Sequence, residues 1–75
     1  MDELKMKFNR DANGWYIYEG GLYLRELMHG VGLFLQVGET YYCTRLEWDD
    51  EEWIVMLGKK RFWLHHKTQY RIILF

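Results

Sequence analysis

The stretch YYCTRLEW, residues 41–48, is followed by an acidic run and then by WIVMLG, residues 53–58. Aromatic and β-branched side chains are frequent in both segments, and such residues suit the half-buried surface of a pleated sheet. The acidic run between them, residues 49–52, has the polarity of an exposed turn. The sequence therefore predicts two antiparallel strands joined by a tight turn, within a small β domain.

Towards the N-terminus, a second hairpin is predicted. Residues 4–9 alternate between apolar and polar side chains, which is the period of a half-buried strand. Asn13-Gly14 then supplies a turn, because this pair readily takes a positive φ. Residues 15–18 form the returning strand, and Gly20-Gly21 ends it.

The remaining segments are also separated by glycine. Residues 22–29 predict either a short strand or a single helical turn. Residues 33–37 predict a strand, and Gly38-Glu39 is the tip of a hairpin that leads into residues 41–48. A last strand is expected from Gln69 to Phe75.

These elements make a single small domain, residues 1–75, of the all-β class. Five to six mainly antiparallel strands recur every 8–12 residues, a rhythm typical of small barrels and sandwiches. We expect a partly open barrel of the Src-homology-3 (SH3-like) type, because closure removes the exposed edges that a flat sheet would leave.

Composition limits the class of protein further. The net charge is −1, so the overall charge of the chain does not favour a polyanionic partner such as nucleic acid. One cysteine excludes an intramolecular disulfide. Residues 1–5 are acidic rather than a signal peptide, and no segment approaches the roughly 20 apolar residues that span a bilayer. We expect a soluble, cytoplasmic protein with no membrane partner.

The chain carries 14 aromatic side chains in 75 residues. Each ring can bury about 150–250 Å², so a few of them replace many aliphatic side chains in the core of a small domain. A domain of this size has little room for all of them. Some Tyr and Trp rings are therefore expected on the surface, where these residues are enriched at contact sites.

Several short motifs resemble a known family. Thr44-Arg45-Leu46-Glu47, a short turn, Trp53 and Gly58, preceded by Asn13-Gly14-Trp15-Tyr16, are similar to a family of small uncharacterised domains of Firmicutes, their phages and mobile elements. The resemblance covers most of the chain. It implies a small β fold and a mobile-element setting, and it implies no activity and no functional residue.

A first candidate surface lies on the predicted strand 41–48. Alternation puts Tyr41, Cys43, Arg45 and Glu47 on the face opposite Leu46 and Trp48. Arg beside Tyr is typical of binding hot spots, although a solvated ion-pair ladder is the simpler interpretation. The acidic turn is either a solubilising turn or a patch that meets a basic partner. The candidate protein-binding residues are Tyr41, Arg45, Glu47, Asp49, Asp50, Glu51 and Glu52.

A second candidate surface lies in residues 59–71, which mix basic and aromatic side chains and contain no acidic residue. Small barrels bind single-stranded nucleic acid with this mixture, because cations follow phosphates and rings stack on bases. Alternatively, residues 62–64 plug one end of the barrel. The candidate nucleic-acid-binding residues are Lys59, Lys60, Arg61, Trp63, Lys67, Tyr70 and Arg71.

Residues for catalysis or metal binding are sparse. The chain has no serine and no phosphate-binding glycine loop. Cys43 has no CxxC partner, and the adjacent His65 and His66 would point to opposite faces of a strand. We expect no enzyme, no metal and no cofactor, with Cys43 packed or partly covered.

The sequence thus favours a non-enzymatic protein-interaction module. In the setting that the resemblance implies, it would bind and modulate a host protein, for example by inhibiting a defence nuclease. Two alternatives remain open: a small single-stranded nucleic-acid-binding barrel that uses residues 59–71, and a self-associating domain that forms a homodimer.

Overall fold

The structure is a computed structural model that describes residues 4–74 and is all-β. No helix occurs in this range, so residues 22–29 contain a strand rather than a helical turn. The strands are β1 (Leu4–Asn9), β2 (Gly14–Glu19), β3 (Leu22–Leu27), β4 (Gly32–Val37), β5 (Thr40–Arg45), β6 (Glu47–Trp48), β7 (Trp53–Leu57), β8 (Lys60–Trp63) and β9 (Tyr70–Leu74).

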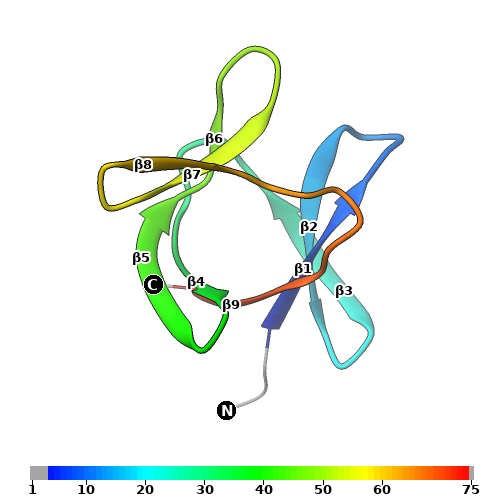
Figure 1. Ribbon diagram of the computed structural model, residues 1–75. Helices are drawn as coiled ribbons and strands as arrows, with labels where there is room; N and C mark the ends of the chain where they lie inside the picture. The colour runs from blue at the N-terminus through cyan, green and yellow to red at the C-terminus, as the bar shows by residue number, and fades with distance from the viewer. Residues whose placement is uncertain (1–3, 75) are drawn as a thin grey trace.

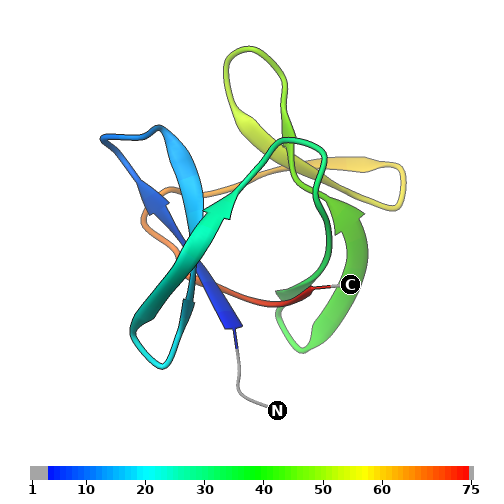
Figure 2. The ribbon, with the colours of Figure 1, turned by 180° about the vertical axis from the view of Figure 1, so that it is seen from behind.

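The nine strands form two antiparallel sheets, whereas five to six strands were expected. The larger sheet has the order β3-β2-β1-β9-β4-β5, and the smaller has the order β6-β7-β8. Figures 1 and 2 show the strands arranged around a common centre. Within residues 4–74 the two ladders do not join, so no closed barrel forms. The last predicted strand is confirmed up to Leu74, and its expected end at Phe75 lies outside the described residues.

The predicted hairpins between β1 and β2 and between β4 and β5 are confirmed, and a further hairpin between β2 and β3 was not predicted. Asn13 takes φ 49° in the turn before β2. Gly20 and Gly21, with φ 56° and 86°, form the two-residue connection between β2 and β3. Positive φ at both loop positions is the requirement of a type I′ turn, which matches the twist of the flanking strands.

The expected hairpin between residues 41–48 and 53–58 is wrong for most of its length. β5 pairs with β4, and only Glu47 and Trp48 pair with β7. The chain leaves the strand at Leu46, whose N–H donates to Val31 O at 3.0 Å and whose carbonyl accepts from the N–H of Gly30 at 2.7 Å. These long-range bonds move residues 40–45 into one sheet and residues 47–48 into the other.

One side chain joins the two sheets. The Thr44 hydroxyl donates to the carbonyl oxygen of Met56 at 2.7 Å and accepts from the Met56 N–H at 3.1 Å. Thr44 is almost fully buried, with 8% of its surface exposed. Its hydroxyl satisfies the same backbone donor and acceptor that a neighbouring strand would satisfy, so it continues the hydrogen bonding from β5 to β7.

The core fills the space between the two sheets. Trp53 closes it on one side, where its indole N–H donates to Asn13 O at 2.9 Å and so links β7 to the turn before β2. Leu64 is buried and Phe62 packs against the core, but Trp63 is 52% exposed, so only part of residues 62–64 acts as the predicted plug. The buried cluster comprises Met6, Trp15, Ile17, Leu27, Leu33, Leu35, Leu46, Trp53, Val55, Leu64, Tyr70 and Ile72.

Candidate functional site on the outer face of the six-stranded sheet

The outer face of β1, β2 and β9 brings basic and aromatic side chains into register. Lys5 lies opposite Tyr18 of β2 on one side and opposite Arg71 of β9 on the other. Lys7 lies opposite Tyr16. These residues alternate with buried ones such as Met6 and Ile17, so the pleat directs them outward. The sheet thus sets a basic row (Lys5, Lys7 and Arg71) beside a line of tyrosines.

The tyrosines form a contiguous group across β2 and β3, here called the tyrosine cluster (Tyr16, Tyr18 and Tyr23). The ring of Tyr23 lies 5.2 Å from that of Tyr16 and 5.9 Å from that of Tyr18, between centroids. The Lys7 ammonium lies over the Tyr18 ring, 4.7 Å from its centroid. Partial burial raises the pKa of the Tyr16 hydroxyl, and the nearby Glu26 carboxylate adds to this. The Tyr16 hydroxyl therefore stays neutral at physiological pH.

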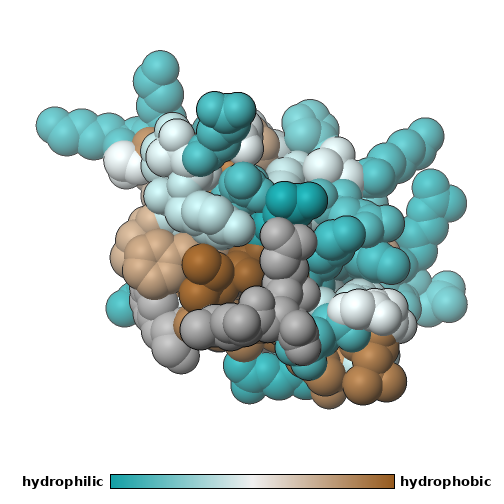
Figure 3. All heavy atoms as spheres, turned by 90° about the horizontal axis from the view of Figure 1, so that it is seen from below, coloured by the Kyte–Doolittle hydropathy of each residue, from teal (hydrophilic) through white to brown (hydrophobic). Residues whose placement is uncertain are grey.

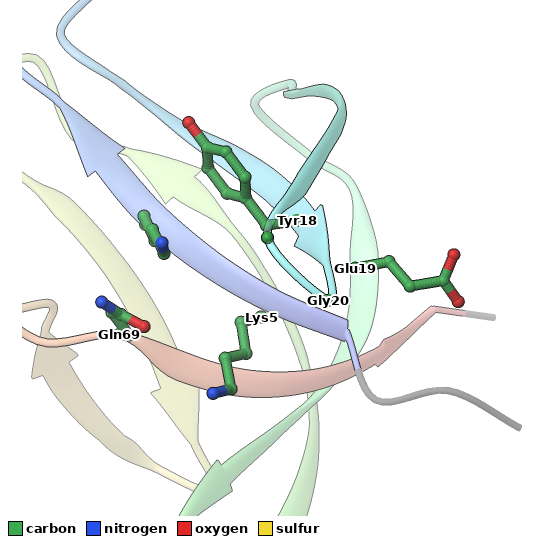
Figure 4. A pocket seen from close by; sticks show the side chains of 7 residues that line it. Lys5, Tyr18, Glu19, Gly20 and Gln69 are labelled. Atoms are coloured by element: carbon green, nitrogen blue, oxygen red, sulfur yellow. The ribbon is translucent and has the colours of Figure 1, made fainter.

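A groove of about 600 Å³ is lined by Lys5 and Lys7 of the basic row and by Tyr18 of the tyrosine cluster. Figure 4 shows Tyr18 on one side of β1 and both Lys5 and Gln69 on the other, with Glu19 extending away from Tyr18. The lining residues are Lys5, Lys7, Tyr18, Glu19, Gly20, Gly21 and Gln69. Its lining includes two lysines, one amide and one carboxylate, so positive charge prevails and the groove suits an anionic or hydrogen-bonding ligand.

Next to the tyrosine cluster, β3 forms an edge of the six-stranded sheet. Every residue of this strand except Leu27 is exposed. Apolar side chains make up much of its surface: Leu22 is 66% exposed, Leu24 43%, and Met28, which directly follows the strand, 66%. Figure 3, a view of the end that carries the β2–β3 and β4–β5 turns, shows separate apolar areas among hydrophilic side chains. The exposed apolar surface around β3 is therefore local.

The predicted protein-binding residues do not form one surface. Tyr41, at the β4–β5 turn, and the acidic residues of the β6–β7 turn lie at opposite ends of the molecule (Figure 1). Arg45 and Glu47 do share a groove of about 470 Å³, together with Cys43, Thr44, Met56 and Gly58. The structure thus supports a smaller patch around Arg45 and Glu47 than the sequence indicated.

The acidic turn is an ordered structural element. The Asp49 carboxylate accepts hydrogen bonds from the N–H of Glu52 at 2.7 Å and of Glu51 at 3.0 Å, and Arg61 lies 3.7 Å away. The two backbone bonds, with a smaller contribution from Arg61, hold the pKa of Asp49 below its usual value. Asp49 is therefore committed to the turn, whereas Asp50, Glu51 and Glu52 remain exposed.

The predicted nucleic-acid-binding residues are also spread apart. Tyr70 is buried, with its hydroxyl accepting from the His65 N–H at 2.9 Å, and Arg61 faces Asp49. Lys59 and Lys60 lie at the β7–β8 turn, and Trp63 and Lys67 line a separate hollow with His65 and His66. Only Arg71 belongs to the outer face of β1 and β9. Residues 59–71 are a stretch of sequence and not one basic surface.

The described residues contain no cluster of three or more potential metal ligands. His66 stacks on Phe8, with the ring centroids 3.7 Å apart, and His29 accepts a hydrogen bond from the Trp48 N–H through Nδ1 at 2.9 Å. Cys43 is exposed on β5, not packed or partly covered as expected, because it shares the outward face with Tyr41 and Arg45. These side chains have structural contacts and do not converge on a common point.

The sequence prediction did not include Lys5, Lys7, Tyr16, Tyr18 and Tyr23 among candidate site residues. A signal was present, because both arms of the first hairpin alternate apolar with basic or aromatic residues. Combined with the register of the hairpin, this alternation puts the lysines beside the tyrosines. The position of Arg71 next to Lys5 depends on a pairing between the two ends of the chain, which alternation alone does not give.

No protein-family model, curated protein or solved structure matches this chain. Among the described residues, no helix is long and apolar enough to cross a membrane. The function must therefore be inferred from the surfaces described above.

Proposed function

We propose that this protein is a non-enzymatic protein-interaction module that binds an extended segment of a partner protein along β3. The observation that carries this proposal is the exposed apolar edge strand. Leu22, Tyr23, Leu24 and Met28 are each between 43% and 66% exposed, on or directly after a strand that pairs on one side only.

An unpaired strand edge presents backbone N–H and carbonyl groups that a second strand can pair with. In recognition by strand addition, these backbone bonds supply affinity, and the side chains alongside supply specificity. Here the tyrosine cluster lies beside the edge on one face of the sheet. Tyrosine offers a large, rigid contact area together with a hydroxyl, which favours it at binding surfaces.

The edge is only partly protected against pairing. A register shift puts Tyr18 opposite Tyr23 and Ile17 opposite Arg25, so Leu24 is an extra residue in the ladder. Such bulges twist an edge and limit continuous pairing, and the charged pair Arg25-Glu26 adds to this. Residues 25–28 follow the bulge, so only a short segment of the edge is available for continuous strand pairing. A short pairing segment favours a specific partner over non-specific strand association.

The scaffold and setting complete the proposal. The two sheets bridged by Thr44 are consistent with a partly open, SH3-like barrel that holds the edge rigidly. If the chain belongs to the family it resembles, a host protein in the bacterial cytoplasm is the first partner to test, and a defence nuclease is one such protein. Arg45, on the opposite edge strand β5, and Glu47, on β6 of the smaller sheet, would then form a secondary contact.

The proposal is tested by affinity capture from a nuclease-treated lysate of source cells, with three baits in parallel. The baits are the wild type, Leu24→Lys and Ile73→Lys. Leu24 and Ile73 are 43% and 42% exposed, so both variants replace equal apolar exposure by the same charge, one on the edge strand and one on β9. We expect Leu24→Lys to lose the partner and Ile73→Lys to keep it.

Backbone amide exchange then locates the contact. In the complex, the amides of residues 22–28 should exchange more slowly than in the free protein, because strand addition protects them. Equal capture by Leu24→Lys and the wild type, or unchanged exchange in this segment, would contradict the proposal. If light scattering instead shows a dimer that Leu24→Lys converts to a monomer, the occupant of the edge is a second copy of this chain.

A further inference from the structure

We propose that the outer face of β1, β2 and β9 binds single-stranded nucleic acid, an activity separate from partner binding along β3. The site combines the basic row with the tyrosine cluster. Neither group is continuous in the sequence. The basic row results from the pairing of β1 with β9, the tyrosine cluster from the pairing of β2 with β3, and the pairing of β1 with β2 sets the two groups side by side.

The spacing of the cations suits a phosphate backbone. Lys5 and Lys7 lie two residues apart on one face of β1, which separates their Cα atoms by about 7 Å. Arg71 lies opposite Lys5 on the neighbouring strand, about 5 Å away in the sheet. A charged chain laid across this face would therefore meet two lysines that line the groove and Arg71 on the neighbouring strand within a short length. Gln69, which also lines the groove, offers a further amide for hydrogen bonding.

The tyrosine cluster lies on the other side of the lysines, where bases would extend from that backbone. Tyr18 is opposite Lys5, Tyr16 is opposite Lys7, and Tyr23 adjoins both rings. Stacking of a base on an aromatic ring stabilises the complex and accepts any base, because every base has a flat aromatic face. The cluster can stack only on unpaired bases, so the site selects single strands over duplexes.

The contact between Lys7 and Tyr18 couples the two halves of the site. In the free protein the Lys7 ammonium covers one face of the Tyr18 ring at 4.7 Å. A phosphate in the groove would attract the ammonium more strongly than the ring does, because a full negative charge exceeds a ring quadrupole. Movement of Lys7 onto a phosphate therefore uncovers the ring for a base.

The charges on this face favour an anionic ligand. Lys5 and Arg71 are like charges directly opposite each other on β1 and β9, so they repel each other, and an anion bound beside both would reduce this repulsion. Among residues 4–74, Glu19 lines the same groove and Glu26 lies opposite Tyr16, so two lysines and one carboxylate contribute charge to the groove. An acidic peptide would use the basic row alone, whereas nucleic acid uses the basic row and the tyrosine cluster together.

The test measures fluorescence anisotropy of a labelled single-stranded oligothymidylate at low salt. The Lys5→Gln/Lys7→Gln variant is compared with Lys59→Gln/Lys60→Gln, which loses the same charge at the exposed β7–β8 turn. We expect the first variant to bind at least roughly tenfold more weakly and its salt dependence to fall by roughly one unit per lysine. The second should change affinity less than roughly threefold.

A third variant separates stacking from charge. Tyr18→Leu should weaken binding while leaving the salt dependence unchanged, and unfolding curves of all variants should confirm that they remain folded. An unlabelled duplex and polyglutamate serve as competitors, and both should compete poorly. The proposal is overturned by absence of binding at low salt, by equal losses in the two double variants, or by polyglutamate competing as well as the oligonucleotide. Capture through β3 is tested separately, because Leu24→Lys replaces no residue of the basic row or of the tyrosine cluster, and Lys5→Gln/Lys7→Gln replaces no residue of β3.

Discussion

Replacing Thr44 by valine tests the connection between the two sheets. Valine has nearly the same shape as threonine but lacks the hydroxyl that donates to Met56 O and accepts from the Met56 N–H. Both backbone groups of Met56 would lose their partner in a part-buried position. Each buried group left unsatisfied costs about 1–3 kcal/mol. Because Met56 is only half-buried, we take the lower value twice and expect a loss of about 2 kcal/mol in the free energy of unfolding.

In a domain of this size, 1 kcal/mol shifts the melting temperature by about 4–8 °C, so Thr44→Val should melt about 8–16 °C lower. Urea unfolding followed by tryptophan fluorescence measures the free energy directly, and an unchanged slope shows that the denatured state is unaffected. Thr44→Ser is the control, since it keeps the hydroxyl and loses one methyl group, at a cost of about 1 kcal/mol. A Thr44→Val protein as stable as the wild type, or less destabilised than Thr44→Ser, would refute the bridge.

Three further predictions concern the turn at Asp49, the turn at Gly21 and the hydrogen bond of Trp53. Asp49→Asn should be less stable than the wild type at pH 7. Because the pKa of Asp49 in the folded protein lies below its unfolded value of about 4, this carboxylate stabilises the fold above about pH 4 and stops doing so as the pH falls through the folded pKa. Unfolding curves of both proteins from pH 7 to 2.5 should therefore converge at low pH. Gly21→Ala should lower the free energy of unfolding by about 1–2 kcal/mol in urea, because φ is 86° at this residue and L-residues avoid that conformation. No atom lies within 4 Å of an added Cβ, so this loss would come from the backbone conformation alone. Gly14→Ala, where φ is not positive, should cost less. Trp53→Phe should cost about 1–3 kcal/mol in the same assay, because it removes the hydrogen bond to Asn13 O and part of a buried ring.

The local features of the fold were predictable because they depend on neighbouring residues. Alternation in residues 4–9 and the glycine and asparagine turns correctly gave the first hairpin and the β4–β5 hairpin. The break at Leu46 was not predictable, because Leu46 continues the alternating pattern of residues 41–48 and leaves the strand only through bonds to Gly30 and Val31. The end of β5 therefore depends on hydrogen bonds to residues about 15 positions earlier in the sequence, which a local pattern does not show.

The candidate site also combines features that a local sequence pattern predicts with features that depend on long-range strand pairing. Tyr70 was predicted at a surface because it stands in a basic stretch, but β9 lies in the middle of the larger sheet and turns Tyr70 into the core. The same strand turns the next residue, Arg71, outward beside Lys5. Sequence alternation indicated that lysines and tyrosines of the first hairpin face one way, and only the strand order showed that β9 adds a third cation and that β3 is an edge.

The central claim is that β3 is the strand edge along which a partner protein binds. Its most direct test is amide hydrogen exchange of the captured complex, read over residues 22–28. Strand addition predicts slower exchange in this segment than in the free protein, while the β7–β8 turn at residues 58–59 exchanges as before. Unchanged exchange in residues 22–28 of a complex that remains intact would contradict the claim.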